Sequence, residues 1–95
     1  MTLHTEPEKV YITGETGEVL AEVTFPVGED GVADINHTFV SEALLGQGVA
    51  GRLMQAAADT LRSQGRKAVA SCSYAAGWFS KHAEYQDLLA YPNKA

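Results

Sequence analysis

The sequence predicts one mixed α+β domain, in which an antiparallel meander precedes a strand–helix–strand unit with parallel strands and a C-terminal helix. Apolar and polar residues alternate over 19–25 and again over 32–40, which is typical of half-buried strands. The apolar spacing becomes helical from Val49 onward, and a further apolar run follows at 67–72. Two strands that flank a single helix in so short a stretch are expected to pair in parallel.

The first half of the chain is expected to form about three strands. Residues 10–12 are a short strand candidate, and the glycines at 14–17 predict a turn before the strand at 19–25. Residues 26–31 then predict a hairpin connection to the strand at 32–40. In that strand, alternation places Ile35, His37 and Phe39 on one face.

The second half is expected to contain two helices. The spacing from Val49 to Leu61 predicts an amphipathic helix, and Gly65 stands where a glycine often follows a helix. Aromatic and apolar residues between 78 and 89 predict a final helix that packs on the sheet. A single domain is therefore expected over residues 1–95, with flexible tails at 1–8 and 91–95.

Composition and charge exclude several classes of protein. The chain is 45% hydrophobic, 20% charged and 8% aromatic, which is ordinary for a globular domain. Its formal charge of −5 argues against a generic nucleic-acid binder. Cys72 is the single cysteine, so an intrachain disulfide and a Cys-rich zinc site are excluded, and no metal site is predicted. No segment has the ~20 apolar residues of a membrane span, and the start lacks a signal-peptide pattern, so a cytoplasmic location is expected.

The segment from Leu45 to Arg52 carries glycines at 46, 48 and 51, between the expected strand and the expected helix. Glycine permits a positive φ and close approach of a ligand to the backbone, and the first turn of a helix offers unpaired N–H groups. Together these features suit an anion such as a pyrophosphate. The alternative is a glycine-rich turn that only leads into the helix. A P-loop is excluded because Gly51 is followed by arginine rather than by lysine and serine or threonine.

The same segment resembles the Arg/Gln-x-x-Gly-x-Gly/Ala signature of the GNAT N-acetyltransferase superfamily, with Leu45 in place of the leading Arg or Gln. His37-Thr38-Phe39-Val40 is similar to the His-Thr-x-Val strand of a small stand-alone subgroup of that family. Cys72-Ser73-Tyr74 and the later run His82-Ala83-Glu84-Tyr85-Gln86-Asp87-Leu88 resemble the subgroup's Cys-x-aromatic and His-Pro-Glu-Tyr-x-Asp-Leu blocks. Ala83 stands where proline is usual. The resemblance covers residues 19–89.

The resemblance implies that acetyl-CoA binds between two parallel strands that splay apart, here the strands ending at Val40 and at Cys72. It implies that the backbone near Val40 holds the pantetheine arm and that the glycine-rich loop holds the pyrophosphate. Leucine at position 45 cannot neutralise a phosphate, so weaker binding is expected, with Arg52 as a partial substitute. The implied cofactor-binding residues are Phe39, Val40, Leu45, Gly46, Gln47, Gly48, Val49, Ala50, Gly51, Arg52, Cys72 and Tyr74.

Three residues are candidates for a catalytic role. Cys72 is either a buried apolar filler, a residue that lines the thioester site, or a nucleophile that forms an acyl-cysteine. His37 is either a general base for the amine or a structural histidine. Tyr74 either donates a proton to the departing thiolate or anchors the last helix.

Three functions remain open from the sequence. The first is acetyl-CoA-dependent transfer of an acetyl group to an amine of a small molecule or a protein. The second is a non-catalytic module that binds CoA or acyl-CoA, and the third is a protein-interaction domain without a cofactor. The chain is short for the family that it resembles and is expected to lack the helices that cover the acceptor side in longer members, so an open acceptor site is expected. No nucleic-acid or membrane partner is expected, and the oligomeric state is left open.

Overall fold

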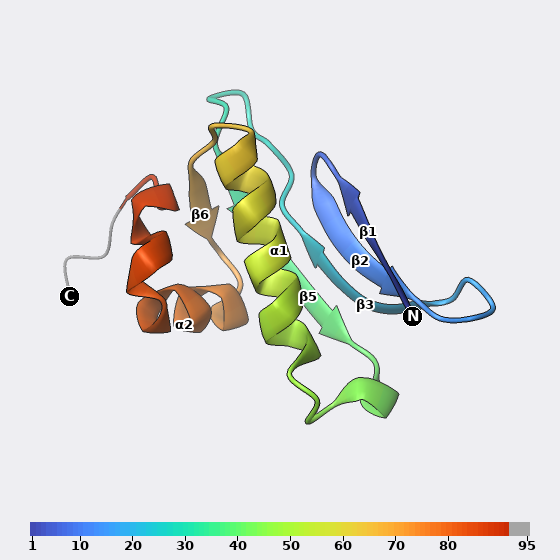
Figure 1. Ribbon diagram of the computed structural model, residues 1–95. Coiled ribbons are helices and arrows are strands. Elements are labelled where there is room, and N and C mark those ends of the chain that lie inside the picture. The colour runs from blue at the N-terminus through green and yellow to red at the C-terminus, as the bar shows by residue number, and fades with distance from the viewer. Residues whose placement is uncertain (92–95) are drawn as a thin grey trace.

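The computed structural model describes residues 1–91, in which helices lie over one face of the β-structure (Figure 1). The mixed α+β class predicted from the sequence is confirmed. The elements follow the order β1 (Thr2–Glu6), β2 (Lys9–Thr13), β3 (Val19–Thr24), β4 (Ala33–Ile35), β5 (His37–Val40), the short 3₁₀ helix η1 (Glu42–Leu44), α1 (Val49–Ser63), β6 (Ala68–Ala70), α2 (Ser73–Lys81) and the 3₁₀ helix η2 (Ala83–Leu88).

Within residues 1–91 the strands form two small sheets. The larger is antiparallel with the order β1-β2-β3-β5, so it has four strands where the sequence predicted about three. The smaller pairs β4 with β6 in parallel, with Ala33 opposite Ala68 and Ile35 opposite Ala70. The parallel pairing predicted across the helix is therefore confirmed.

Asn36 separates β4 from β5, although the sequence predicts one strand there. The Asn36 N–H donates to the carbonyl oxygen of Thr24 at 3.2 Å, and its side-chain oxygen accepts from the Thr24 hydroxyl at 2.6 Å. Ile35 is buried before this break, whereas His37 and Phe39 are exposed after it. A local irregularity changes which alternate residues face the core. The expectation that Ile35 shares a face with His37 and Phe39 is therefore wrong.

The expected flexible tail over residues 1–8 is also wrong, because residues 2–6 form β1. This strand pairs with β2 from Thr2 opposite Thr13 to Glu6 opposite Lys9. The ring of His4 stacks on that of Tyr11, with centroids 4.7 Å apart, and its Nε2 lies 2.8 Å from the Thr13 hydroxyl. These cross-strand contacts order a segment that has little apolar character of its own.

Helix α1 supplies much of the core. Its buried side chains recur at helical spacing and pack against β2, β3 and β5. Gly65 follows the end of α1 with a φ of 69°, which confirms the prediction that this glycine follows the helix. Among residues 1–91, no helix combines the length and apolar character of a membrane span. The core residues from α1 are Val49, Leu53, Met54, Ala57, Ala58 and Leu61.

The helix expected over 78–89 is instead two elements, α2 and η2. Helix α2 begins earlier, at Ser73, and ends before His82, whose φ of −125° and ψ of 80° are not helical. The His82 Nδ1 lies 2.8 Å from the carbonyl oxygen of Trp78, which stabilises this break. Beyond η2, the Ala90 N–H donates to Ala68 of β6 at 2.8 Å. Apart from Tyr91, the tail predicted over 91–95 lies outside the described residues.

Candidate functional site

The strands β5 and β6 diverge where β4 ends. The carbonyl oxygen of Ile35, the last residue of β4, accepts the N–H groups of Ser71 and Cys72, each at 3.1 Å. After this point β5 pairs with β3, while the chain beyond Cys72 turns away into α2. Because β5 is the last strand of its sheet, the backbone on its outer edge is available to an extended ligand.

Cys72 lies at the junction where the two strands diverge. It is the N-cap of α2, and its Sγ accepts the N–H of Ala75 at 3.3 Å. The same sulfur lies 3.4 Å from the hydroxyl oxygen of Thr38 on β5. The thiol is half-buried and packs against the core. Cys72 therefore lines the junction and also stabilises the start of α2.

The loop that leads into α1 is exposed and contains two glycines in the left-handed region, Gly46 with a φ of 82° and Gly48 with a φ of 73°. Gly48 is the N-cap, so no side chain caps the helix start. The N–H groups of Val49 to Gly51 precede the first helical hydrogen bond, which joins the Arg52 N–H to Gly48 at 3.2 Å. These amides and the helix dipole favour a bound anion.

A cavity of about 520 Å³ lies between the first turns of α1 and one face of α2. Arg52, Lys81 and His82 give it basic character, and the Arg52 guanidinium also donates to the carbonyl oxygen of Gln47 at 3.4 Å. A Cβ added to Gly51 would lie 3.6 Å from the Tyr74 hydroxyl, so the two helices approach closely there. The lining residues are Gly48, Gly51, Arg52, Gln55, Ser73, Tyr74, Gly77, Trp78, Lys81 and His82.

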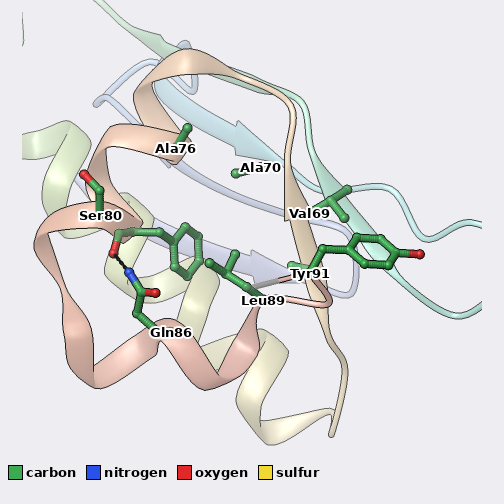
Figure 2. A pocket seen from close by; sticks show the side chains of 9 residues that line it. Val69, Ala70, Ala76, Ser80, Gln86, Leu89 and Tyr91 are labelled. Carbon is green, nitrogen blue, oxygen red and sulfur yellow. Dashed lines mark hydrogen bonds between the residues drawn. The ribbon is translucent and has the colours of Figure 1, made fainter. Parts of the chain in front are cut away.

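A second cavity, of about 350 Å³, lies between β6 and α2 (Figure 2). Figure 2 shows Ala70, Ala76 and Leu89 around it. The Gln86 side-chain amide donates to the Phe79 carbonyl oxygen at 2.6 Å. None of its described lining residues is charged. A phosphate-bearing ligand therefore suits the basic cavity at α1 and not this one.

The structure places the residues predicted from the sequence in three groups. The loop residues from Leu45 to Arg52 lie together at the start of α1, although the Val49 side chain is buried, so only its backbone can contact a ligand. Cys72 and Tyr74 lie at the start of α2, and Tyr74 shares a cavity with Gly48, Gly51 and Arg52 of that loop. On β5 the Val40 side chain is half-buried, whereas Phe39 is 41% exposed on the opposite face.

The fold does not bring His37 to the Cys72 thiol. It is exposed on the outer face of β5, while its neighbour Thr38 carries the side chain that contacts Cys72. Successive side chains of a strand point to opposite faces, so the imidazole points away from that contact. Its role as a general base stays a prediction.

Sequence reasoning missed most of the α2 side of the basic cavity. Ser73, Gly77 and Lys81 recur every four residues, and so do Tyr74, Trp78 and His82. This spacing places each set along one side of a helix, and it is the signal that could have identified them. This spacing was not recognised as a site, because the same aromatic residues also fit a helix that packs on the sheet.

Tyr85 holds η2 against α1 behind the cavity. Its hydroxyl donates to Asp59 at 2.7 Å, and this hydrogen bond is the main reason why the pKa of Tyr85 is raised. The Tyr85 ring also packs near Trp78, with centroids 5.2 Å apart, and Trp78 stacks on His82 at 4.0 Å. This cluster fixes the side of the cavity that carries His82.

Comparison with solved structures shows the same fold in other proteins. A GCN5-like protein from Staphylococcus aureus, solved by NMR, is 32% identical with a TM-score of 0.77, over 98% of this chain and 91% of that one. A ribosomal-protein-alanine N-acetyltransferase from Brucella melitensis biovar Abortus 2308 is 18% identical with a TM-score of 0.57. Glucosamine-6-phosphate N-acetyltransferase from Arabidopsis thaliana is also 18% identical, with a TM-score of 0.53.

The coverage differs between these structures. The matches to the Brucella and Arabidopsis enzymes cover 92% and 94% of this chain but 65% and 63% of theirs, so this chain corresponds to part of each enzyme. No curated protein sequence matches the chain. The model of the family described as GCN5-related N-acetyl-transferase matches residues 9–88. With most of its length matched, the chain belongs to the GCN5-related N-acetyltransferase family.

Proposed function

We propose that this protein transfers an acetyl group from acetyl-CoA to an amine. The observation that carries the proposal is the juxtaposition of the free edge of β5, the uncapped start of α1 and the basic cavity between α1 and α2. The family supports acyl transfer in general, and the donor and the acceptor are part of the proposal.

The residues present fit the charged half of acetyl-CoA. The amides from Val49 to Gly51 would hold the pyrophosphate, because they lack helical acceptors and lie at the positive end of α1. Arg52 and Lys81 would neutralise phosphate charge in the adjoining cavity. Leu45 is 62% exposed and adds no charge. The amides and the two cations therefore have to supply the phosphate affinity.

The edge of β5 fits the pantetheine arm, which carries amide groups that can pair with a strand. Backbone groups of Val40 on this edge would align the arm so that it ends near Thr38 and Cys72. Acetyl-CoA supplies a thioester carbonyl that an uncharged amine can attack. A backbone N–H near Val40 would stabilise the negative charge that develops on the carbonyl oxygen.

In this proposal Cys72 lines the thioester site, and the neutral amine attacks the thioester carbon directly. The C–S bond breaks as the C–N bond forms, CoA leaves as a thiolate, and the nitrogen releases its extra proton to water. The Cys72 sulfur already contacts the Ala75 N–H and the Thr38 hydroxyl, which fixes its position. Direct attack requires no protein nucleophile. Tyr74 lines the basic cavity and is 42% exposed, and its hydroxyl is the proposed proton donor to the departing thiolate.

The test has two parts. The midpoint of thermal unfolding is measured with and without acetyl-CoA, and a ligand at about 100 times its Kd adds about 2.7 kcal/mol. For a domain of this size that is roughly 10–20 °C. Release of free CoA thiol is then followed with a panel of amines. No stabilisation by millimolar acetyl-CoA contradicts the binding proposal, and stabilisation without amine-dependent thiol release contradicts the catalytic one.

A further inference from the structure

The face of the four-stranded sheet opposite α1 carries one row of side chains that crosses all four strands. His4 lies opposite Tyr11, Tyr11 opposite Glu22, and Glu22 opposite Phe39. We call these four residues the outer row. At ordinary strand spacing the outer row is about 14 Å long. A carboxylate therefore lies between two aromatic rings on an open surface.

The outer row remains accessible to solvent because α1 packs on the other face of the sheet. The buried residues of β2 and β3, such as Val10 and Val23, alternate with the outer row and face α1. Phe39 is 41% exposed, and the Glu22 side chain is 25% exposed. Aromatic residues are enriched in protein interfaces, so the exposed rings of the outer row are candidates for contact with a partner.

The protein's own Lys9 shows which chemistry this surface accepts. Its Nζ lies 3.9 Å from a Glu22 carboxylate oxygen and 4.9 Å from the centroid of the Tyr11 ring. The ammonium therefore receives one ion-pair contact and one cation–π contact from the outer row. Because the Lys9 side chain is 40% exposed, another ammonium can displace it at little cost.

We infer that the outer row binds a lysine-bearing polypeptide, and that this polypeptide is the amine acceptor. The peptide's role as amine acceptor rests on the proposed function, whereas its binding to the outer row does not. The net charge of −5 favours a basic partner. A row spread along an open sheet face suits an extended chain, because sites for small molecules are concave. The outer row ends on Phe39 of β5, the strand whose edge borders the proposed thioester site.

The experiment measures the Kd of a fluorescein-labelled hexalysine peptide by fluorescence anisotropy, at low ionic strength and without acetyl-CoA. Glu22→Gln is expected to weaken binding about twofold to fivefold, because it removes the carboxylate between the rings. Lys9→Gln is expected to tighten binding by a similar factor, because it removes the internal competitor. The matched controls are Glu29→Gln and Lys67→Gln, which make the same charge changes away from the outer row, and each is expected to change the Kd less than its partner.

Several results overturn the inference. They are an absence of hexalysine binding, equal effects of Glu22→Gln and Glu29→Gln, and weaker binding by Lys9→Gln. Intact-mass analysis of hexalysine after incubation with protein and acetyl-CoA tests the acceptor role, and an unmodified peptide contradicts it. Failure of acetyl-CoA to stabilise the protein would contradict the proposed function alone, because the peptide binding is measured without that ligand.

Discussion

The substitution Gly51→Asp tests whether the start of α1 binds the phosphates of acetyl-CoA. Gly51 is in the first turn, and an added Cβ meets only ordinary van der Waals contact, 3.6 Å from the Tyr74 hydroxyl. The new carboxylate is favourable for the helix, because acids in the first turn complement the dipole and glycine is a poor helix former. The free energy of unfolding is therefore expected to rise by about 0.5–1 kcal/mol in the absence of ligand.

The same carboxylate repels a phosphate bound to the neighbouring amides. At about 5 Å, two unit charges near a protein surface repel by roughly 1–3 kcal/mol. The Kd for acetyl-CoA is therefore expected to rise roughly 5-fold to 150-fold. Isothermal titration calorimetry measures the Kd, and thermal unfolding without ligand measures the stability.

Gly51→Ala is the matched control, because it fills the same space without a charge. It is expected to leave the Kd within about twofold of the wild-type value. If Gly51→Asp binds acetyl-CoA as tightly as the wild-type protein does, the phosphates do not lie at the start of α1, and the assignment of the loop is refuted.

Three further predictions concern the thiol, a tyrosine and the core. Cys72→Ser keeps an N-cap acceptor for the Ala75 N–H and is expected to retain acetyl transfer. Cys72→Ala removes that acceptor and is expected to lower the free energy of unfolding by about 1 kcal/mol. Loss of turnover in both variants, with acetyl-CoA binding intact, would favour a covalent role for the thiol. The hydrogen bond to Asp59 raises the pKa of Tyr85. The stability from this hydrogen bond is therefore present below about pH 10, the ordinary tyrosine pKa, and is lost as the pH rises through the higher folded-state pKa. In denaturant unfolding above pH 10, the stability of Tyr85→Phe should depend less on pH than that of the wild-type protein. Leu53→Ala removes a side chain that is 1% exposed and should cost about 2–5 kcal/mol in chemical denaturation, and a cost below 1 kcal/mol would contradict the packing of α1 on the sheet.

Local patterns predicted the parts of the fold that depend on local sequence. The helical spacing that begins at Val49 predicted α1, and the glycine at position 65 predicted where it ends. Both signals are local, because they need only the residues of the helix and its C-terminal end. The parallel pairing of β4 with β6 followed from the order of the elements, because connections between parallel strands obey few topologies.

Non-local contacts account for what the sequence did not predict. Alternation continues without interruption across Asn36, so only its hydrogen bonds to Thr24 reveal that β4 and β5 belong to different sheets. The segment 2–6 is mostly polar and becomes a strand through its pairing with β2, where His4 stacks on Tyr11. Likewise, the end of α2 at His82 depends on a hydrogen bond that a stripe of apolar residues does not encode.

The candidate site divides in the same way. The loop from Leu45 to Arg52 was predicted because its glycines and its position before a helix are local features. Lys81 and His82 were not, because they join the cavity only when α2 packs beside the start of α1. From its residue type, His37 was a candidate for either a general base or a structural histidine, and the face it occupies depends on the break at Asn36.

The most direct test of the central claim is a titration of ¹⁵N-labelled protein with acetyl-CoA, followed by the amide signals. The account predicts the largest shifts at Val49, Ala50 and Gly51 and on β5 at Phe39 and Val40, with smaller changes on β1. Unchanged signals at the start of α1 in saturating acetyl-CoA would contradict the account, and so would shifts confined to the cavity between β6 and α2.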